Sequence, residues 1–229
     1  MIPLRDVIPS RTTPYITITI IALNAIAWLF EISLPHDALN EFLTIYGVVP
    51  AYFAWPTLIT SMFLHGGWMH VIGNMWYLWI FGDNVEDRVG HGRFIVFYLL
   101  CGIAAAAGQV VVDPNSTLPV IGASGAIAGV MGAYIVLYPH SRILMLFPFP
   151  FFLYELPALF FLGFWFLMQF LSGVGALREI GAGDMSGGVA FWAHIAGFIV
   201  GFVLIRVMRR PERMEVEWWS EEKPDRRIG

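Results

Sequence analysis

The chain consists of six long hydrophobic runs separated by shorter polar segments. A helix needs about 20 apolar residues to cross the roughly 30 Å hydrocarbon core of a bilayer, and shorter runs suffice where other helices shield them. The pattern therefore predicts an all-α membrane protein with six transmembrane helices. The expected spans are approximately Tyr15 to Leu34, Trp68 to Phe81, Phe94 to Val112, Ser124 to Tyr138, Leu156 to Leu177 and Val189 to Met208.

The segments outside these runs differ in character. Pro35 to His65 contains no Lys or Arg but several aromatic residues, which predicts short helices lying partly in the membrane interface. The chain then divides into an N-terminal tail (1–14), a six-helix domain (15–208) and a C-terminal tail (209–229). The mixed charges of the C-terminal tail are typical of a solvated or surface-lying segment.

The composition agrees with a membrane protein. Of the 229 residues, 58% are hydrophobic and 13% are charged, and the mean hydropathy is +0.69. These values lie outside the balance of a soluble globular domain. The single cysteine, Cys101, lies in an apolar run, so it cannot form an internal disulfide and is expected to fill the core.

The distribution of basic residues predicts the orientation. With a cytoplasmic N-terminus, twelve of the thirteen Lys and Arg residues fall in cytoplasmic segments and only Arg178 falls outside. Cytoplasmic loops carry such an excess of Lys and Arg. We therefore expect a multi-pass integral protein with both termini in the cytoplasm, and its short termini favour the cell membrane of a prokaryote.

Few polar side chains interrupt the six runs, and such residues usually face a bundle interior or a water-filled cavity. Asn24 and Gln169 are most simply interhelical hydrogen-bonding residues. The second, fourth and sixth helices all run inward from the external face, and they carry His70, Ser124 and His194 near their starts. At 1.5 Å of rise per residue, these three side chains lie within about two turns of one depth below the outer surface.

Glycine spacing gives a second constraint on two of these residues. Gly125-x-x-x-Gly129 follows Ser124 directly, and Gly197-x-x-x-Gly201 follows shortly after His194. Such small-residue stripes let two helices approach closely, which would bring the hydroxyl and the imidazole to a common mouth. Because a serine hydroxyl needs an adjacent base to become a nucleophile, the pair is a candidate Ser-His dyad.

His70 and Asn74 are four residues apart and share one helical face. With the backbone N–H of Ser124 at the start of its helix, they are candidate donors to an oxyanion. No Asp or Glu is placed to complete a Ser-His-Asp triad, and Ala126 departs from the G-x-S-x-G elbow. His65 and His70 have no third ligand nearby, and cofactor motifs are absent, so we expect neither a metal nor a cofactor.

Each of these features alone has a simpler interpretation. A lone serine among glycines is usually a packing residue, a lone buried histidine usually bonds a backbone carbonyl, and His70 with Asn74 could form a polar seam between helices. Their joint occurrence at one depth favours a site.

Three motifs then relate the chain to a known family. They are HVIGN (His70 to Asn74), GASGA (Gly122 to Ala126) and AHIAGFIVG (Ala193 to Gly201). Over about residues 15 to 208 the chain resembles the rhomboid intramembrane serine proteases. The resemblance implies a compact six-helix bundle with a water-filled cavity open to the outside.

The resemblance also implies roles for the residues. Ser124 would be the nucleophile, His194 the general base and acid, and His70, Asn74 and the Ser124 amide the oxyanion hole. Substrates would be transmembrane helices cleaved near their outer ends at small residues, with the aromatic-rich fifth helix as a lateral gate. Two positions depart from the family. Ala128 stands where many members carry a Tyr that stacks on the imidazole, and Trp55-Pro56 stands where members often have Trp-Arg.

The sequence thus predicts a serine endopeptidase whose partners are transmembrane protein substrates and the lipid bilayer, with no nucleic acid and no metal. One alternative is a non-catalytic relative that binds transmembrane clients. Another is a small transporter that uses the polar mouth, although polar groups barely reach the bilayer midplane.

Overall fold

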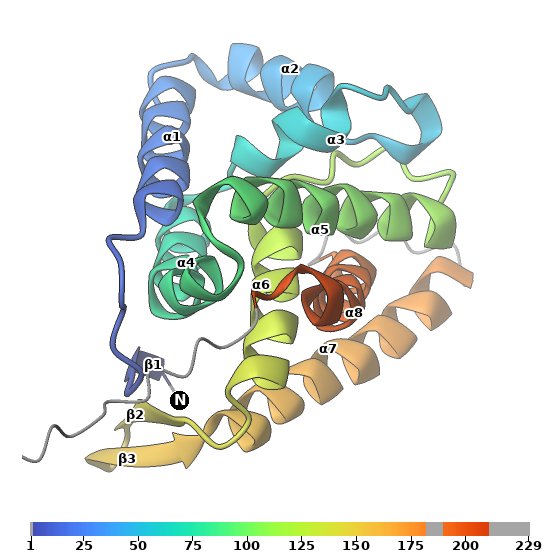
Figure 1. The fold of residues 1–229 in the computed structure, drawn as a ribbon. Helices are drawn as coiled ribbons and strands as arrows, with labels where there is room; N and C mark the ends of the chain where they lie inside the picture. The colour runs from blue at the N-terminus through green and yellow to red at the C-terminus, as the bar shows by residue number, and fades with distance from the viewer. Residues whose placement is uncertain (1, 182–189, 211–229) are drawn as a thin grey trace, which may run out of the picture.

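The structure is a computed structural model that describes residues 2–181 and 190–210. The predicted start of the sixth span at Val189, and the predicted tail from residue 211 on, lie outside these residues. Most of the described chain is helical (Figure 1). The long helices are α1 (Tyr15–Glu31), α4 (Trp68–Val89), α5 (His91–Val112), α6 (Ser124–Leu137), α7 (Ala158–Gly181) and α8 (Phe191–Met208).

A helix lies in each of the six hydrophobic runs. Of the described helices, α5, α8 and residues Ala158–Leu177 of α7 are long and apolar enough to cross a membrane, whereas α1 and α6 are shorter apolar helices. The segment before α4 contains short helices, as the sequence predicts. They are α2 (His36–Tyr46), α3 (Thr57–Thr60) and the 3₁₀ turns η1 (Pro50–Tyr52) and η2 (Ser61–Phe63).

Helix α4 continues about two turns beyond its predicted end at Phe81. The added turns are polar, so hydrophobicity did not indicate them. Their carboxylates bind the N-terminal segment: Asp83 accepts a hydrogen bond from Ser10, and Asp87 accepts one from the backbone N–H of Arg11. These contacts join residues more than 70 positions apart.

The all-α prediction is wrong at one end of the molecule. β1 (Ile2–Asp6), β2 (Arg142–Pro148) and β3 (Phe151–Pro157) form an antiparallel sheet in the order β1-β2-β3. Proline cannot continue a helix interior, so the Pro148-x-Pro150 stretch breaks this apolar segment into a hairpin. Ile143 and Met145 alternate inward from β2 and are fully buried.

The sheet and the helix ends define two ends of the molecule. Figure 1 shows the sheet at one end, near the start of α7, and α2 at the other. The backbone N–H of Arg210, just after α8, donates to the carbonyl of Arg88 in the last turn of α4 at 2.8 Å. One end of the molecule, which we call the sheet end, therefore contains the N-terminal strand, the α6–α7 connection and the ends of α4 and α8.

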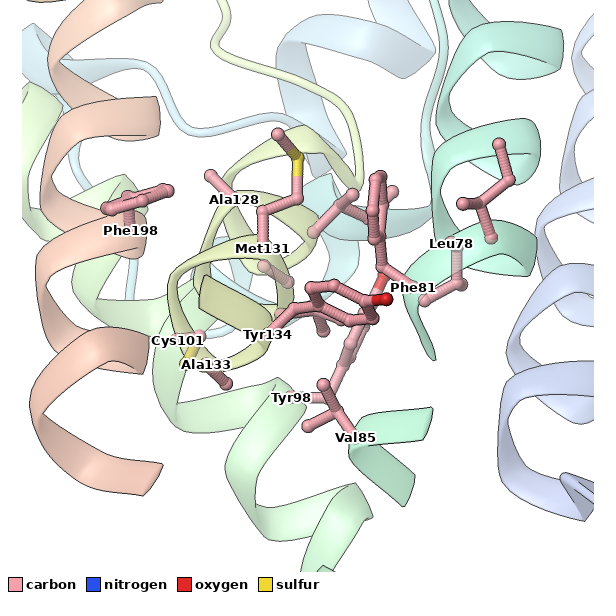
Figure 2. Close-up of a cluster of buried hydrophobic side chains, with 14 of the residues drawn as sticks. Leu78, Phe81, Val85, Tyr98, Cys101, Ala128, Met131, Ala133, Tyr134 and Phe198 are labelled. Carbon is pink, nitrogen blue, oxygen red and sulfur yellow. The ribbon is translucent and has the colours of Figure 1, made fainter. Parts of the chain in front are cut away.

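Helix α6 is the centre of the core. Every residue from Gly125 to Ile135 is buried, with Phe198 of α8 on one side and Phe81 of α4 on the other (Figure 2). A Cβ added to Gly201 would lie 1.9 Å from the carbonyl oxygen of Gly129. The glycine stripes therefore bring the backbones of α6 and α8 into contact, as their spacing predicts. Cys101 is buried and free, as expected of a core residue.

Candidate active site

Ser124 and His194 meet where α6 and α8 begin. Ser124 is the first residue of α6, and His194 lies one turn into α8. The Nε2 atom of His194 is 2.8 Å from the Oγ atom of Ser124, although the two residues are 70 positions apart in the chain. The close approach of the two glycine-lined helices below this level makes the contact possible.

The other ring nitrogen of His194 contacts α7. Its Nδ1 atom is 2.8 Å from Oε1 of Gln169. The ring of Trp165, one turn before Gln169, lies 5.9 Å from the imidazole and is tilted by 38°. Because an amide oxygen only accepts, this bond places the imidazole proton on Nδ1 and leaves the Nε2 lone pair directed at Ser124.

The two interhelical polar residues expected from the sequence have different outcomes. Gln169 does bond across helices, but the sequence did not identify His194 as its partner. Asn24 does not: its Nδ2 atom donates to the carbonyl of Ile20, one turn earlier in its own helix, at 2.8 Å. A short polar side chain in a helix can satisfy itself this way, which the expectation for Asn24 overlooked.

His70 and Asn74 lie on the first two turns of α4, each held by a residue just before that helix. The backbone N–H of Gly66 donates to Nδ1 of His70 at 3.3 Å, so Nε2 carries the proton of a neutral ring. Nδ2 of Asn74 donates to Nε2 of His65 at 2.9 Å. This role of His65 is not visible in the sequence, because only the folded loop brings it to Asn74.

His65 is kept neutral by its surroundings. Burial, with His70 close by, lowers the pKa of His65 to about 4. Its ring lies 4.9 Å from that of His70. Its backbone N–H donates to Oε2 of Glu31 at the end of α1, at 3.0 Å. A neutral His65 can accept the hydrogen bond from Asn74, which fixes the direction of that amide.

The donors of His70 and Asn74 converge on the turn before Ser124. A Cβ added to Gly122 would lie 2.6 Å from Nε2 of His70 and 3.6 Å from Nδ2 of Asn74. Gly122 has a φ of +117°, a conformation that favours glycine. Glycine is thus required here both by its backbone angle and by the space that the two side chains fill.

A small cavity lies beside the serine. It measures about 20 Å³, and its lining includes Ser61, Gly122, Ser124 and Ala193. That volume accommodates about one water molecule. Ser124 also begins a helix, where backbone N–H groups lack helical partners and carry the positive end of the dipole. A small anionic oxygen would be stabilised at this position.

Metal chemistry has no visible ligand set in this region. Within residues 2–181 and 190–210, no three His, Cys, Asp or Glu side chains are grouped so that they could hold a metal ion. The groups gathered around Ser124 are a hydroxyl, imidazoles and amides, which are the groups that acyl transfer uses.

Comparisons with known proteins are consistent with this arrangement. A family model described as Rhomboid domain matches residues 52–211. Over 128 residues the chain is 36% identical to YdcA of Bacillus subtilis, covering 55% of this chain and 63% of that protein. It is 39% identical over 88 residues to rhomboid protease GluP of the same organism, covering 38% of this chain and 17% of that protein.

A plant relative extends over more of the chain. Rhomboid-like protein 11, chloroplastic, of Arabidopsis thaliana is 26% identical over 200 residues, covering 82% of this chain and 66% of that protein. In each of these comparisons the chain spans less than two thirds of the relative's own length. Similar proteins thus occur both in bacteria and in organelles.

Proposed function

Because the chain belongs to the rhomboid family, within which relatives are named as proteases, we propose that it is an intramembrane serine endopeptidase that uses Ser124 and His194. The observation that carries the proposal is the 2.8 Å separation of Ser124 Oγ and His194 Nε2. That distance is within hydrogen-bond reach of a general base. The amide oxygen at Nδ1 supports the tautomer that accepts a proton at Nε2.

The proposed reaction proceeds through an acyl-enzyme. His194 takes the hydroxyl proton as Ser124 Oγ attacks the scissile carbonyl carbon, and the carbonyl oxygen becomes an oxyanion. Collapse of this intermediate breaks the C–N bond, and His194 returns the proton to the leaving amine. Water, activated by the same imidazole, then hydrolyses the ester and releases the new carboxyl terminus.

The proposed oxyanion hole consists of three N–H donors. They are Nε2 of His70, Nδ2 of Asn74 and the backbone amide of Ser124. The convergence of the two side chains on Gly122 supports this role, and so does the small adjacent cavity. Fixed donors need no reorganisation when charge develops, and each such donor typically contributes about 10²- to 10³-fold in rate.

In the proposed topology six helices cross the membrane, both termini are cytoplasmic and the site lies below the outer surface. The distribution of basic residues supports it. The gathering of the N-terminal strand and the end of α8 at one end of the molecule is consistent with it. The long apolar helices and the bacterial relatives support an integral membrane protein, and a prokaryotic cell membrane is its proposed location.

The proposed substrates are transmembrane helices cut near their outer ends. An intact helix hides its peptide bonds in internal hydrogen bonds, so a scissile segment must unwind before attack. Unwinding is easier close to the water-accessible surface and at small or helix-breaking residues. The partners are therefore membrane proteins and the lipid bilayer itself.

Covalent labelling tests the proposal. A fluorophosphonate should modify Ser124 of the purified protein, as read by peptide mapping, and Ser124→Ala should abolish both labelling and cleavage of a transmembrane substrate in liposomes. Unlabelled wild-type protein that still binds transmembrane peptides would instead indicate a non-catalytic relative. Solute uptake into liposomes that depends on His70 would indicate a transporter.

A further inference from the structure

Within the part of the chain that the structure describes, helix α7 supplies the one hydrogen-bond partner of Nδ1, the ring nitrogen of His194 that does not contact Ser124. We infer that Gln169 is a positioning residue: its amide oxygen accepts the Nδ1–H of His194 and so fixes the tautomer and orientation in which Nε2 serves Ser124. This inference rests on the proposed function for its catalytic meaning. The bond itself is 2.8 Å long.

The direction of this bond decides whether the dyad works. With Oε1 of Gln169 toward Nδ1, the imidazole proton lies on Nδ1 and the Nε2 lone pair faces the serine hydroxyl. If the amide NH₂ faced Nδ1 instead, a neutral ring would carry its proton on Nε2. Nε2 would then have no lone pair with which to take the hydroxyl proton. A glutamine at this position can therefore enable or disable the base.

Packing on both sides of Gln169 keeps α7 against α8. One turn before it, the ring of Phe166 lies 4.7 Å from that of Phe198, and Trp165 lies 6.1 Å from the same ring. One turn after it, the carbonyl of Gly173 accepts a 3.1 Å hydrogen bond from Nε1 of Trp192. Gln169 is thus held between two anchoring contacts.

Helix α6 does not supply an aromatic contact at the corresponding level. The residue one turn after Ser124 is Ala128, which is fully buried but too small to stack on the imidazole. The aromatic contact comes from Trp165, so both the stacking and the Nδ1 hydrogen bond originate on α7. A displacement of α7 at this level would therefore release His194.

Two variants of similar size separate the acceptor from the bulk of the side chain. Gln169→Met keeps the length but has no amide oxygen, whereas Gln169→Glu keeps an acceptor oxygen whether it is ionised or neutral. We expect Gln169→Met to lower kcat roughly 10- to 100-fold with KM nearly unchanged, part of the 10²- to 10⁴-fold that a general base contributes. Gln169→Glu should recover most of that loss.

The matched control is Phe166→Leu, which loosens the same α7–α8 interface without removing the hydrogen bond. It should lower the unfolding temperature in detergent at least as much as Gln169→Met does, while kcat stays near the wild-type value. Wild-type kcat in Gln169→Met would overturn the inference, as would a loss of kcat in Phe166→Leu equal to that in Gln169→Met.

A spectroscopic readout does not depend on protease activity. ¹⁵N chemical shifts of His194 in Ser124→Ala protein should indicate a ring protonated on Nδ1, and the added change Gln169→Met should yield a mixture of tautomers. A ring protonated on Nε2 would overturn the inference even if Ser124 is labelled. Conversely, an unlabelled Ser124 with the expected tautomer would reject the proposed protease but retain the positioning role.

Discussion

The two ends of the molecule use different hydrogen-bond chemistry. At the end that carries Ser124, the side-chain bonds join mainly a hydroxyl, imidazoles and amides: Ser124 with His194, and Asn74 with His65. One carboxylate there, Glu31, accepts from the backbone N–H of His65. At the sheet end, single carboxylates collect several donors. Glu86 accepts from the backbone N–H groups of Ile16 and Thr17 at 3.0 and 2.8 Å and from the Thr17 hydroxyl at 2.7 Å.

A second carboxylate at the sheet end ties three segments together. Oδ2 of Asp6, in β1, accepts from the hydroxyl of Tyr134 in α6 at 2.6 Å and from Nδ2 of Asn84 in α4 at 2.9 Å. Both bonds join Asp6 to segments far away in the chain, so one carboxyl group connects β1, α4 and α6. The sheet end thus joins separate segments through shared carboxylates, whereas the proposed site relies mainly on bonds among hydroxyl, imidazole and amide groups.

The largest expected effect is loss of activity in the folded protein. His194→Ala should reduce cleavage of a transmembrane substrate by roughly 10⁴-fold, because no other base among residues 2–181 and 190–210 is hydrogen-bonded to Ser124. Because His194 is buried and bonds both Ser124 and Gln169, the substitution should also lower the unfolding temperature, so cleavage is compared per folded molecule. Cleavage assays in liposomes and thermal unfolding in detergent measure the two. Near-normal cleavage would contradict the assigned base.

The second-largest expected effect is the loss of an oxyanion donor, and two asparagines on α4 provide a variant and its matched control. Asn74→Leu should lower kcat about 10²- to 10³-fold through loss of an oxyanion donor. Asn84→Leu, nearly three turns further along the same helix, should leave kcat of the folded enzyme unchanged and lower stability instead, because it removes a donor to Asp6. Equal losses of kcat in both variants would mean that the effect is structural.

Removing a carboxylate at the sheet end should have the converse result. Glu86→Gln keeps the shape but replaces with a neutral amide a carboxylate that accepts from three N–H and O–H donors and also lies 2.5 Å from Nδ1 of His91. We expect a loss of about 2 kcal/mol in the free energy of unfolding. The activity per folded molecule should stay within about twofold of the wild type. Urea or thermal unfolding measures the stability, and a cleavage assay measures the activity. An unchanged free energy of unfolding would contradict the idea that the carboxylates of the sheet end stabilise the fold.

The smallest expected effect is on the pH dependence of the free energy of unfolding. Asp6 at the sheet end and His65 at the end with Ser124 should contribute to it with opposite signs. Burial raises the pKa of Asp6 from 3.8 to about 6, and nearby Asp83 adds to the rise. Its contribution to stability is therefore present below pH 3.8 and is lost as the pH rises through 6. His65, with its pKa lowered from 6.5 to about 4, contributes above pH 6.5 and loses that contribution as the pH falls toward 4.

Thermal unfolding at pH 7 and pH 4.5 separates the two contributions. Asp6→Asn should lose more stability on acidification than the wild type, and His65→Gln should lose less. Each difference should be about 1–2 kcal/mol once solvent screening is allowed for. Identical pH responses in the wild type and both variants would show that neither group is linked to folding.

The hydrophobic pattern by itself determined where the long helices lie, because burial in a bilayer or a core depends on local runs of apolar residues. Glycine spacing determined which two helices meet, since only the absence of side chains permits the contact between Gly129 and Gly201. The motifs around Ser124 and His194 also indicated the family, which the family match over residues 52–211 confirms.

Only the tertiary structure decided how these parts are supported. The strand at Ile2–Asp6 exists because β2, more than 130 residues later, offers it a partner, and the polar end of α4 exists because the N-terminal segment binds its carboxylates. The bonds from Gln169 to His194 and from His65 to Asn74 join side chains whose sequence neighbours give no sign of them. A hydrogen bond requires its two atoms to be placed to within a few tenths of an ångström. For residues that lie far apart in the chain, only the packing of the whole bundle sets those positions.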